Sequence, residues 1–406
     1  MKKILKIAGI SLAVVAVSAL LATGILALIR NKNVAKTGNV LGVSWYNETD
    51  KEFSVDTAEQ LNELARLSSF YDFKGQTIKL SADIVLNSGD AKDWKSDAPK
   101  NRWTPITGFA GTFDGQGHTI SGLYGKGHQS AMAMFVNTGD NCTIQNVKLV
   151  NSYIETVGSD GSASFVVNGS GTFKQLYSNA IISHRGDRAA GIFSRATRPA
   201  VLEECWFDGT IDITLSTAGG IVDEVKNTTI DVNHCLFSGT INSSLVPYDA
   251  GRTCVGGMVG QVTNTMNQAS AARMEDCLSS GVINAQSTNA TGSFLGYIAS
   301  GGQAAATIKD SFASNKTATV PYGSSTGSFT GNAIVTREQE LLGEKGYQWT
   351  MLDFDNHWVA VENKAPELKW AAKEALDVTG VEKAYDISWY NSNEIEKKLS
   401  EIFNDK

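Results

Sequence analysis

The chain has 406 residues, of which 35 are basic and 42 acidic, so its formal net charge is −7. This balance excludes electrostatic capture of nucleic acid by the whole chain, and we expect no nucleic-acid partner. Glycine is frequent (39 residues) and proline is rare (6 residues), which excludes collagen and proline-rich disorder. Because 42% of the residues are hydrophobic and only 19% are charged, the composition favours a large, extended all-β protein.

The N-terminal segment, residues 1–36, predicts export. Lys2, Lys3 and Lys6 precede an apolar stretch that carries no charge from Ile7 to Ile29. The apolar part of a cleaved signal peptide has about 7 to 15 residues, whereas this stretch is long enough to cross a hydrocarbon core of about 30 Å. We therefore predict an N-terminal hydrophobic helix that holds the protein at the outer face of a bacterial cytoplasmic membrane. The alternative is a cleaved signal peptide and a secreted protein.

Two short sequence motifs, called words below, recur through residues 128–335 with a period near 30 residues. The first is a small residue followed by apolar residues, at Ala133, Ser164, Gly191, Gly220, Gly257, Ser293 and Ser328. The second is an apolar residue, two polar residues and a small or apolar residue, beginning at Ile144, Phe173, Leu202, Val232, Met274 and Ile308. A period of this length with glycine punctuation is typical of a parallel β-solenoid, whose turns must stack to bury their apolar faces.

In a stack of this kind, equivalent residues form rows along the axis. The first position of the second word is apolar in every copy, so we assign this row to a core ladder. The fourth position contains Cys205, Cys235 and Cys277, and Val147 or Leu176 replaces cysteine in other copies. Interchange with aliphatic residues predicts buried, reduced thiols in the core, and a disulfide or a metal site is the alternative.

One segment carries a resemblance to a known family. Residues 109–123, FAGTFDGQGHTISGL, followed by the small-apolar words, resemble the GLUG-motif proteins of bacterial cell surfaces. Only Gly257-Met-Val-Gly260 keeps both glycines of the motif. The resemblance covers residues 43–370 and implies a right-handed parallel β-helix in an exported, surface-attached protein. It offers no catalytic residue to carry over, and we expect no cofactor and no metal.

The two ends of a solenoid expose strand edges and need covers. In the N-terminal capping region, residues 40–127, Thr57 and an apolar face that includes Leu61 and Leu64 predict a helix over about 57–68 that plugs this end. Residues 336–372 are predicted to form the C-terminal cap. All tryptophans except Trp206 lie outside the repeats, as expected for aromatic caps.

The tail, residues 373–406, contains a short segment that is similar in sequence to residues 43–47. Ile387-Ser-Trp389-Tyr390-Asn391 repeats the pattern of Val43-Ser-Trp45-Tyr46-Asn47, and both segments precede a helical stretch. The second helical stretch runs from Glu394 to Phe403. The tail is either a helix that docks on the cap or the remnant of a longer tandem protein.

Two rows next to the cysteines are candidate sites. The row before them contains Glu204, His234, Asp276 and Asp310, and the residues that replace these in other copies predict a solvated corner, with catalysis as the alternative. The row after them is mostly apolar and contains Tyr177, Trp206, Leu236, Leu278 and Phe312. If the cysteines point inward, alternation turns this apolar row outward and makes it a candidate binding surface. If the chain bends at the polar pair, the row is ordinary core.

These features favour a binding or structural module over an enzyme, because the repeats show no fixed set of nucleophile, base and oxyanion donor. We expect an adhesin-like protein whose partner is a glycan, a host surface or a component of the cell envelope. The first alternative is a polysaccharide lyase or glycoside hydrolase of the β-helix type. The second alternative is a passive stalk.

Overall fold

The computed structural model describes residues 43–384, except 129–130, 215–216, 245–253, 266–267, 286–289, 300–302 and 326. The predicted anchor (1–36) and the last part of the tail (385–406) lie outside the described residues. The chain divides into two compact units, residues 1–50 and 51–406, and the account below concerns the second. Within the described part of the chain, no helix is long and apolar enough to span a membrane.

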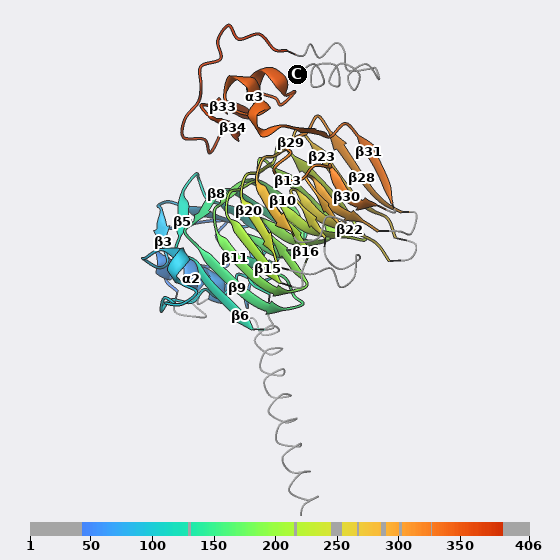
Figure 1. The fold of residues 1–406 in the computed structure, drawn as a ribbon. Coiled ribbons are helices and arrows are strands. Elements are labelled where there is room, and N and C mark those ends of the chain that lie inside the picture. The colour runs from blue at the N-terminus through green and yellow to red at the C-terminus, as the bar shows by residue number, and fades with distance from the viewer. Residues whose placement is uncertain are drawn as a thin grey trace, which may run out of the picture. The chain divides into compact units, whose positions relative to one another are not determined.

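Parallel strands dominate the second unit (Figure 1), and its largest sheet has 22 strands arranged in three columns. The first column contains β7 (Phe135–Asn137), β10 (Val166–Ser178), β13 (Phe193–Glu203), β17 (Val222–Lys226), β22 (Val259–Thr263), β27 (Leu295–Ile298) and β30 (Tyr322–Ser325). The second contains β1 (Glu52–Val55), β2 (Thr77–Leu80), β4 (Thr112–Asp114), β8 (Thr143–Val150), β18 (Thr229–Asn233), β23 (Ser270–Glu275), β28 (Ala304–Lys309) and β31 (Ser328–Gly331). The third contains β3 (Ile84–Val85), β5 (Thr119–Ser121), β14 (Trp206–Phe207), β19 (Leu236–Phe237), β24 (Leu278–Ser279), β29 (Phe312–Ser314) and β32 (Ile334–Thr336). The long strands β10 and β13 reach into the second column.

Two smaller parallel sheets complete each turn of the chain. One consists of β6 (Tyr124–His128), β9 (Tyr153–Gly158), β11 (Ile181–Gly186), β15 (Thr210–Thr214), β20 (Thr240–Ser243) and β25 (Val282–Ala285). The other consists of β12 (Arg188–Ala190), β16 (Thr217–Gly219), β21 (Val255–Gly256) and β26 (Thr291–Gly292). Each turn places its strands on those of the turn before, and we call one such turn a rung and residues 52–336 the parallel stack.

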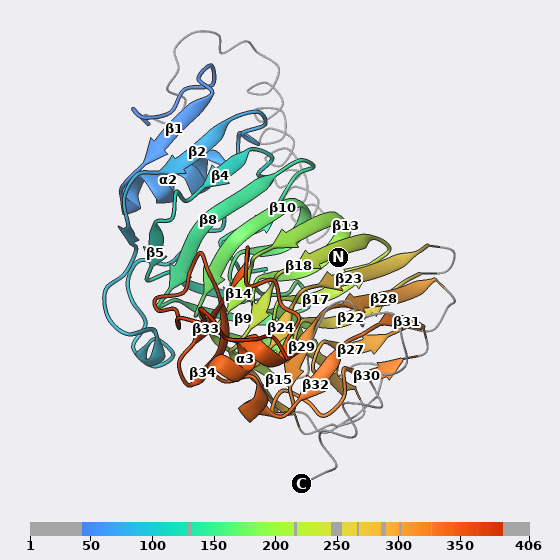
Figure 2. The same ribbon diagram turned by 90° about the horizontal axis from the view of Figure 1, so that it is seen from above.

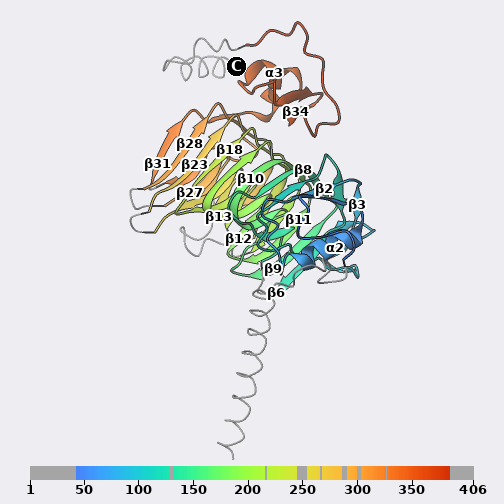
Figure 3. The ribbon, with the colours of Figure 1, turned by 180° about the vertical axis from the view of Figure 1, so that it is seen from behind.

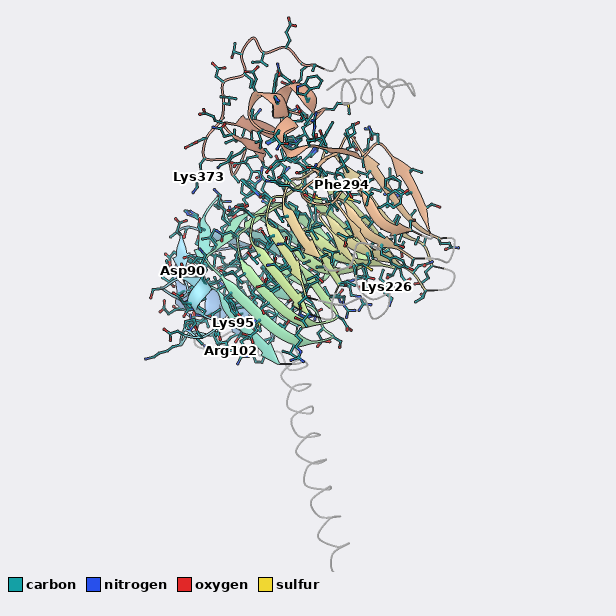
Figure 4. The ribbon with its side chains drawn as sticks, viewed as in Figure 1. Asp90, Lys95, Arg102, Lys226, Phe294 and Lys373 are labelled. Atoms are coloured by element: carbon teal, nitrogen blue, oxygen red, sulfur yellow. The ribbon has the colours of Figure 1, made fainter. Side chains whose placement is uncertain are left out.

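The predicted core ladder is one row of the stack. Phe173 pairs in register with Ile144 and Leu202, and the row continues through Val232, Met274 and Ile308. All of these side chains are buried, and the same row extends back through Phe113, Ile78 and Phe53. Figure 4 labels Phe294, which is fully buried in the stack, and Lys95, which is exposed in the N-terminal capping region.

A left-handed residue bends each turn between the second and third columns. The residues at this corner have φ between +49° and +55° and are Asn146, Gln175, Glu204, His234, Asp276 and Asp310. Asparagine, aspartate and histidine tolerate this conformation better than other side chains, whereas Gln175 and Glu204 adopt it at some cost. The bend leaves the cysteine row facing the core, and the following row faces away from it.

The predicted N-terminal helix is present as α2 (Ala58–Leu67). The side chain of Thr57 accepts a hydrogen bond from the Gln60 backbone, and Gln60 completes the capping box. Leu61 and Leu64 are fully buried, and α2 lies at the end of the stack that contains β2 and β3 (Figure 3). A short 3₁₀ helix, η1 (Ala91–Asp93), follows in this capping region.

The C-terminal segment forms a small subdomain, residues 337–384. It contains η2 (Glu338–Glu340), α3 (Glu344–Trp349) and an antiparallel hairpin of β33 (Trp358–Val361) and β34 (Lys364–Leu368). The subdomain packs on the third column through Leu341, Leu352, Trp358 and Leu368 (Figure 2). Residues 336–372 are the predicted C-terminal cap, and the described contacts of this segment lie along the apolar row on the flank of the stack.

Candidate functional site

The cysteines are core residues. All five, Cys142, Cys205, Cys235, Cys254 and Cys277, are free and buried. Burial raises the pKa of the Cys142 thiol to about 12 and that of Cys254 to about 12, so these thiols stay protonated and are poor nucleophiles and metal ligands. Among the described residues, no group of three or more His, Cys, Asp or Glu side chains is placed to hold a metal ion.

The apolar row after the cysteines faces away from the core, yet it is not open to solvent. Trp206 is 6% exposed, and Leu236, Leu278 and Phe312 are at most 2% exposed, because the C-terminal subdomain covers them. Tyr177 packs beside them with its ring at 5.0 Å from that of Trp206. The direction follows from the strand alternation, but the expectation of an accessible binding surface is wrong. The row is an interface within the chain.

Glu204 and Asp276 of the acidic corner are also covered, contrary to the prediction of a solvated corner. Asp276 accepts hydrogen bonds from His234 Nδ1 (2.9 Å) and from Trp358 Nε1 (2.8 Å). Glu204 lies 3.0 Å from His357 Nδ1, and the imidazoles of His234 and His357 stack with centroids 3.7 Å apart. We call Glu204, His234, Asp276, His357 and Trp358 the polar clasp.

The polar clasp joins the stack to the subdomain. Glu204 and Asp276 are only 6% and 5% exposed, and Asp276 also accepts from the backbone N–H of Asp353 at 3.0 Å. Burial lowers the pKa of His234, but the hydrogen bond to Asp276 and the negative charges of Asp276, Glu203 and Glu204 together outweigh this effect, and the net pKa is raised. Because protein groups occupy these carboxylates, we assign them a structural role in place of the catalytic alternative.

A second charged cluster lies at the bend between the four-stranded sheet and the first column. Asp223 is fully buried, burial raises its pKa well above the usual range, and it accepts a hydrogen bond from Thr217 Oγ1 at 2.9 Å. Its neighbour Glu224 pairs with Arg195 at 2.9 Å and with Arg188 at 3.6 Å. The raised pKa favours a neutral Asp223 that acts as an internal hydrogen-bonding group.

An open groove of about 680 Å³ crosses the start of the second column. Its lining is contributed by successive rungs and consists of Asp140, Asn141, Ser170, Gly171, Thr172, Arg198, Pro199, Ala200, Val201, Thr229, Asp231 and Arg273. From Asp140 through Ser170, Arg198 and Asp231 to Arg273 there are four intervals between rungs, which span about 19 Å at about 4.8 Å each.

Ion pairs hold the charged side chains of the groove in place. Arg198 pairs with Asp140 and also donates to the backbone carbonyl of Thr138 at 2.6 Å. Ser170 Oγ donates to the same Asp140 carboxylate at 2.9 Å. Arg273 pairs with Asp231 on the adjacent rung at 3.3 Å. The guanidinium and carboxylate groups remain partly exposed, so they can still meet a ligand.

Sequence reasoning did not single out the groove. Asp231 and Arg273 directly precede the core-ladder residues Val232 and Met274, and opposite charges at that position in consecutive copies predict a cross-strand pair. The contact of Arg198 with Asp140 spans two rungs and has no local sequence signal.

Comparisons with known proteins bear on the fold. The chain is similar to a solved structure from Bacteroides ovatus named a "putative immunoglobulin A1 protease", with a TM-score of 0.53 and 17% identity over 79% of this chain and 93% of that chain. At this identity the likeness concerns the fold alone. A stretch of 127 residues, 31% of this chain, is 25% identical to Halomucin of Haloquadratum walsbyi and spans 1% of that protein. No protein-family model matches the chain.

Proposed function

We propose that this chain is a right-handed parallel β-helix, exported and held at the cell surface, that works as an adhesin-like binding module. The groove of about 680 Å³ is the observation that carries the proposal, because several rungs build this open concavity and line it with charged side chains. The resemblance of residues 109–123 to the GLUG-motif proteins of bacterial cell surfaces supports a surface location.

The chemistry of the groove favours a glycan as the ligand. A sugar hydroxyl both donates and accepts hydrogen bonds, so it can satisfy Asp140 and Asp231 as well as Arg198 and Arg273. Pro199 and Ala200 add apolar contact between the charged pairs. An extended chain can gather many weak contacts along the rungs, which is how a repetitive face gains avidity.

A glycan array probed with the full-length protein in detergent micelles tests this proposal. The Arg198→Ala and Arg273→Ala variants should lose most of the binding, because each removes a guanidinium that faces the groove. The matched control is Lys126→Ala, which removes a cation paired with Glu155 on the six-stranded sheet, outside the groove. Equal binding by all three variants would contradict the proposal.

The same preparation separates binding from catalysis. If the alternative of a β-helix lyase or hydrolase holds, bound polysaccharide is depolymerised, and Asp140→Asn and Asp231→Asn abolish the release of new chain ends. If the alternative of a passive stalk holds, no glycan is retained at any concentration.

A further inference from the structure

The last rung leaves the end of the core uncovered by any described residue. Three inward-facing residues of this rung, Tyr322, Phe329 and Val335, pair with Leu295, Ala306 and Ala313 of the rung before. The residues of the earlier rung are at most 1% exposed, whereas Tyr322 is 37% exposed and Phe329 and Val335 are half-buried.

The strand edges of this rung are also unprotected. β30, β31 and β32 each pair with a strand of the preceding rung and with no other described strand. Figure 1 shows β30 and β31 at the far end of the stack from α2. No charged residue occurs between Lys316 and Arg337, although charges and covering elements are the usual protection of a free edge. An apolar core end with uncharged strand edges is expected to be covered by another segment or molecule.

The chain itself supplies a candidate partner next to this end. The last described residue, Ala384, donates its backbone N–H to the Gln348 carbonyl in α3 at 2.9 Å. Lys383 lies over the rings of Tyr347 and Phe354, at 4.2 and 4.4 Å from their centroids. Helix α3 contacts η2, which begins shortly after β32. Residues 385–406 therefore start beside α3, in the subdomain that directly follows the last rung along the chain.

The sequence of residues 385–406 fits a cover. Ile395, Leu399, Ile402 and Phe403 are spaced so that a helix would place them on one face. They follow Ile387-Ser-Trp389-Tyr390-Asn391, which repeats the words that precede α2 at the opposite end of the stack. We propose that residues 385–406 dock on the last rung and cover Tyr322, Phe329 and Val335 with this apolar face.

Cross-linking in the full-length protein tests whether residues 385–406 cover the last rung. Thr330→Cys places a thiol on the exposed β31 edge, and Lys398→Cys places one beside the apolar face, whereas the native cysteines are all buried. A short bismaleimide should link the two within one chain. A control pair with Lys95→Cys, exposed in the N-terminal capping region, should give no link. A covalent dimer would assign the rung to a second copy and overturn the proposal, as would the absence of any link.

Amide hydrogen exchange provides an independent measurement. The double variant Leu399→Ser/Phe403→Ser should raise the exchange rate of residues 322–336 by about tenfold or more, because it removes the covering face. The matched control, Lys397→Ser/Glu401→Ser, alters the opposite face without changing net charge and should leave the rates unchanged. Unchanged exchange in the apolar double variant would overturn the proposal. Glycan binding in the groove is not expected to change in either variant, so this test is separate from that of the proposed function.

Discussion

Two outward faces of the same stack differ in their exposure to solvent. The face of Trp206, Leu236 and Leu278 is apolar and lies beneath the C-terminal subdomain, whereas the face of Arg198 and Arg273 is charged and stays open as a groove. Both are built by identical rung-to-rung pairing. In a repeat protein, the side chains of the outward row therefore determine whether a face is buried or stays open. An apolar row is buried by another segment, whereas a row of paired polar side chains can remain in water.

Truncation of Trp358, in the subdomain that covers the apolar row, should have the largest effect on stability. Trp358 is fully buried against the apolar row and donates to Asp276. We expect Trp358→Ala to lower the free energy of unfolding by about 3–5 kcal/mol, the range for a buried aromatic. Urea denaturation measures it, and Val85→Ala, at a position 60% exposed, is the control. If Trp358→Ala lowered the free energy of unfolding no more than the control does, packing of the subdomain on the apolar row would not contribute to stability.

Loss of the polar clasp should have a smaller effect. Asp276→Ala leaves the Trp358 indole N–H, the Asp353 backbone N–H and His234 without their acceptor. We expect a loss of about 1–3 kcal/mol, the cost of leaving buried donors unpaired. Urea denaturation followed by tryptophan fluorescence reports it. Unchanged stability would show that the apolar contacts alone hold the subdomain.

The polar clasp also predicts a dependence on pH. Burial lowers the pKa of folded His234, but the hydrogen bond to Asp276 and the charges of the nearby carboxylates together raise it above its ordinary 6.5, so protonation stabilises the folded state. This contribution is complete below about pH 6.5 and is lost as the pH rises through the folded pKa. The unfolding free energy should therefore fall as the pH rises from about 6.5 through the raised pKa of folded His234, and His234→Gln should flatten that slope. A rise in stability over the same range would contradict the assignment.

The open face should contribute least to stability. Arg273 and Asp231 are both partly exposed, and surface pairs of this kind contribute about 0–1 kcal/mol. We expect Arg273→Ala to leave urea unfolding nearly unchanged while it weakens glycan retention. A large loss of stability would place this pair with the structural contacts of the covered face.

Several features were predictable from the sequence because they are local or repeat at a fixed period. The capping box at Thr57 and Gln60 specifies α2, and the strictly apolar row from Ile144 to Ile308 specifies the core ladder and its register. Cysteines that alternate with Val147 and Leu176 could be placed in the core for the same reason. The direction of the Trp206 row stayed open at the level of the sequence, because alternation turns it outward and a bend at the polar pair would turn it inward.

What covers each surface was decided only by the tertiary structure. The contacts of His357 with Glu204 and of Trp358 with Asp276 join residues far apart in the chain, and no periodicity links a stack residue to a hairpin residue. The same holds for the two-rung reach of Arg198 to Asp140 in the groove. Strand periodicity specifies which way a side chain points, whereas exposure depends on whichever distant segment gains most by burying it.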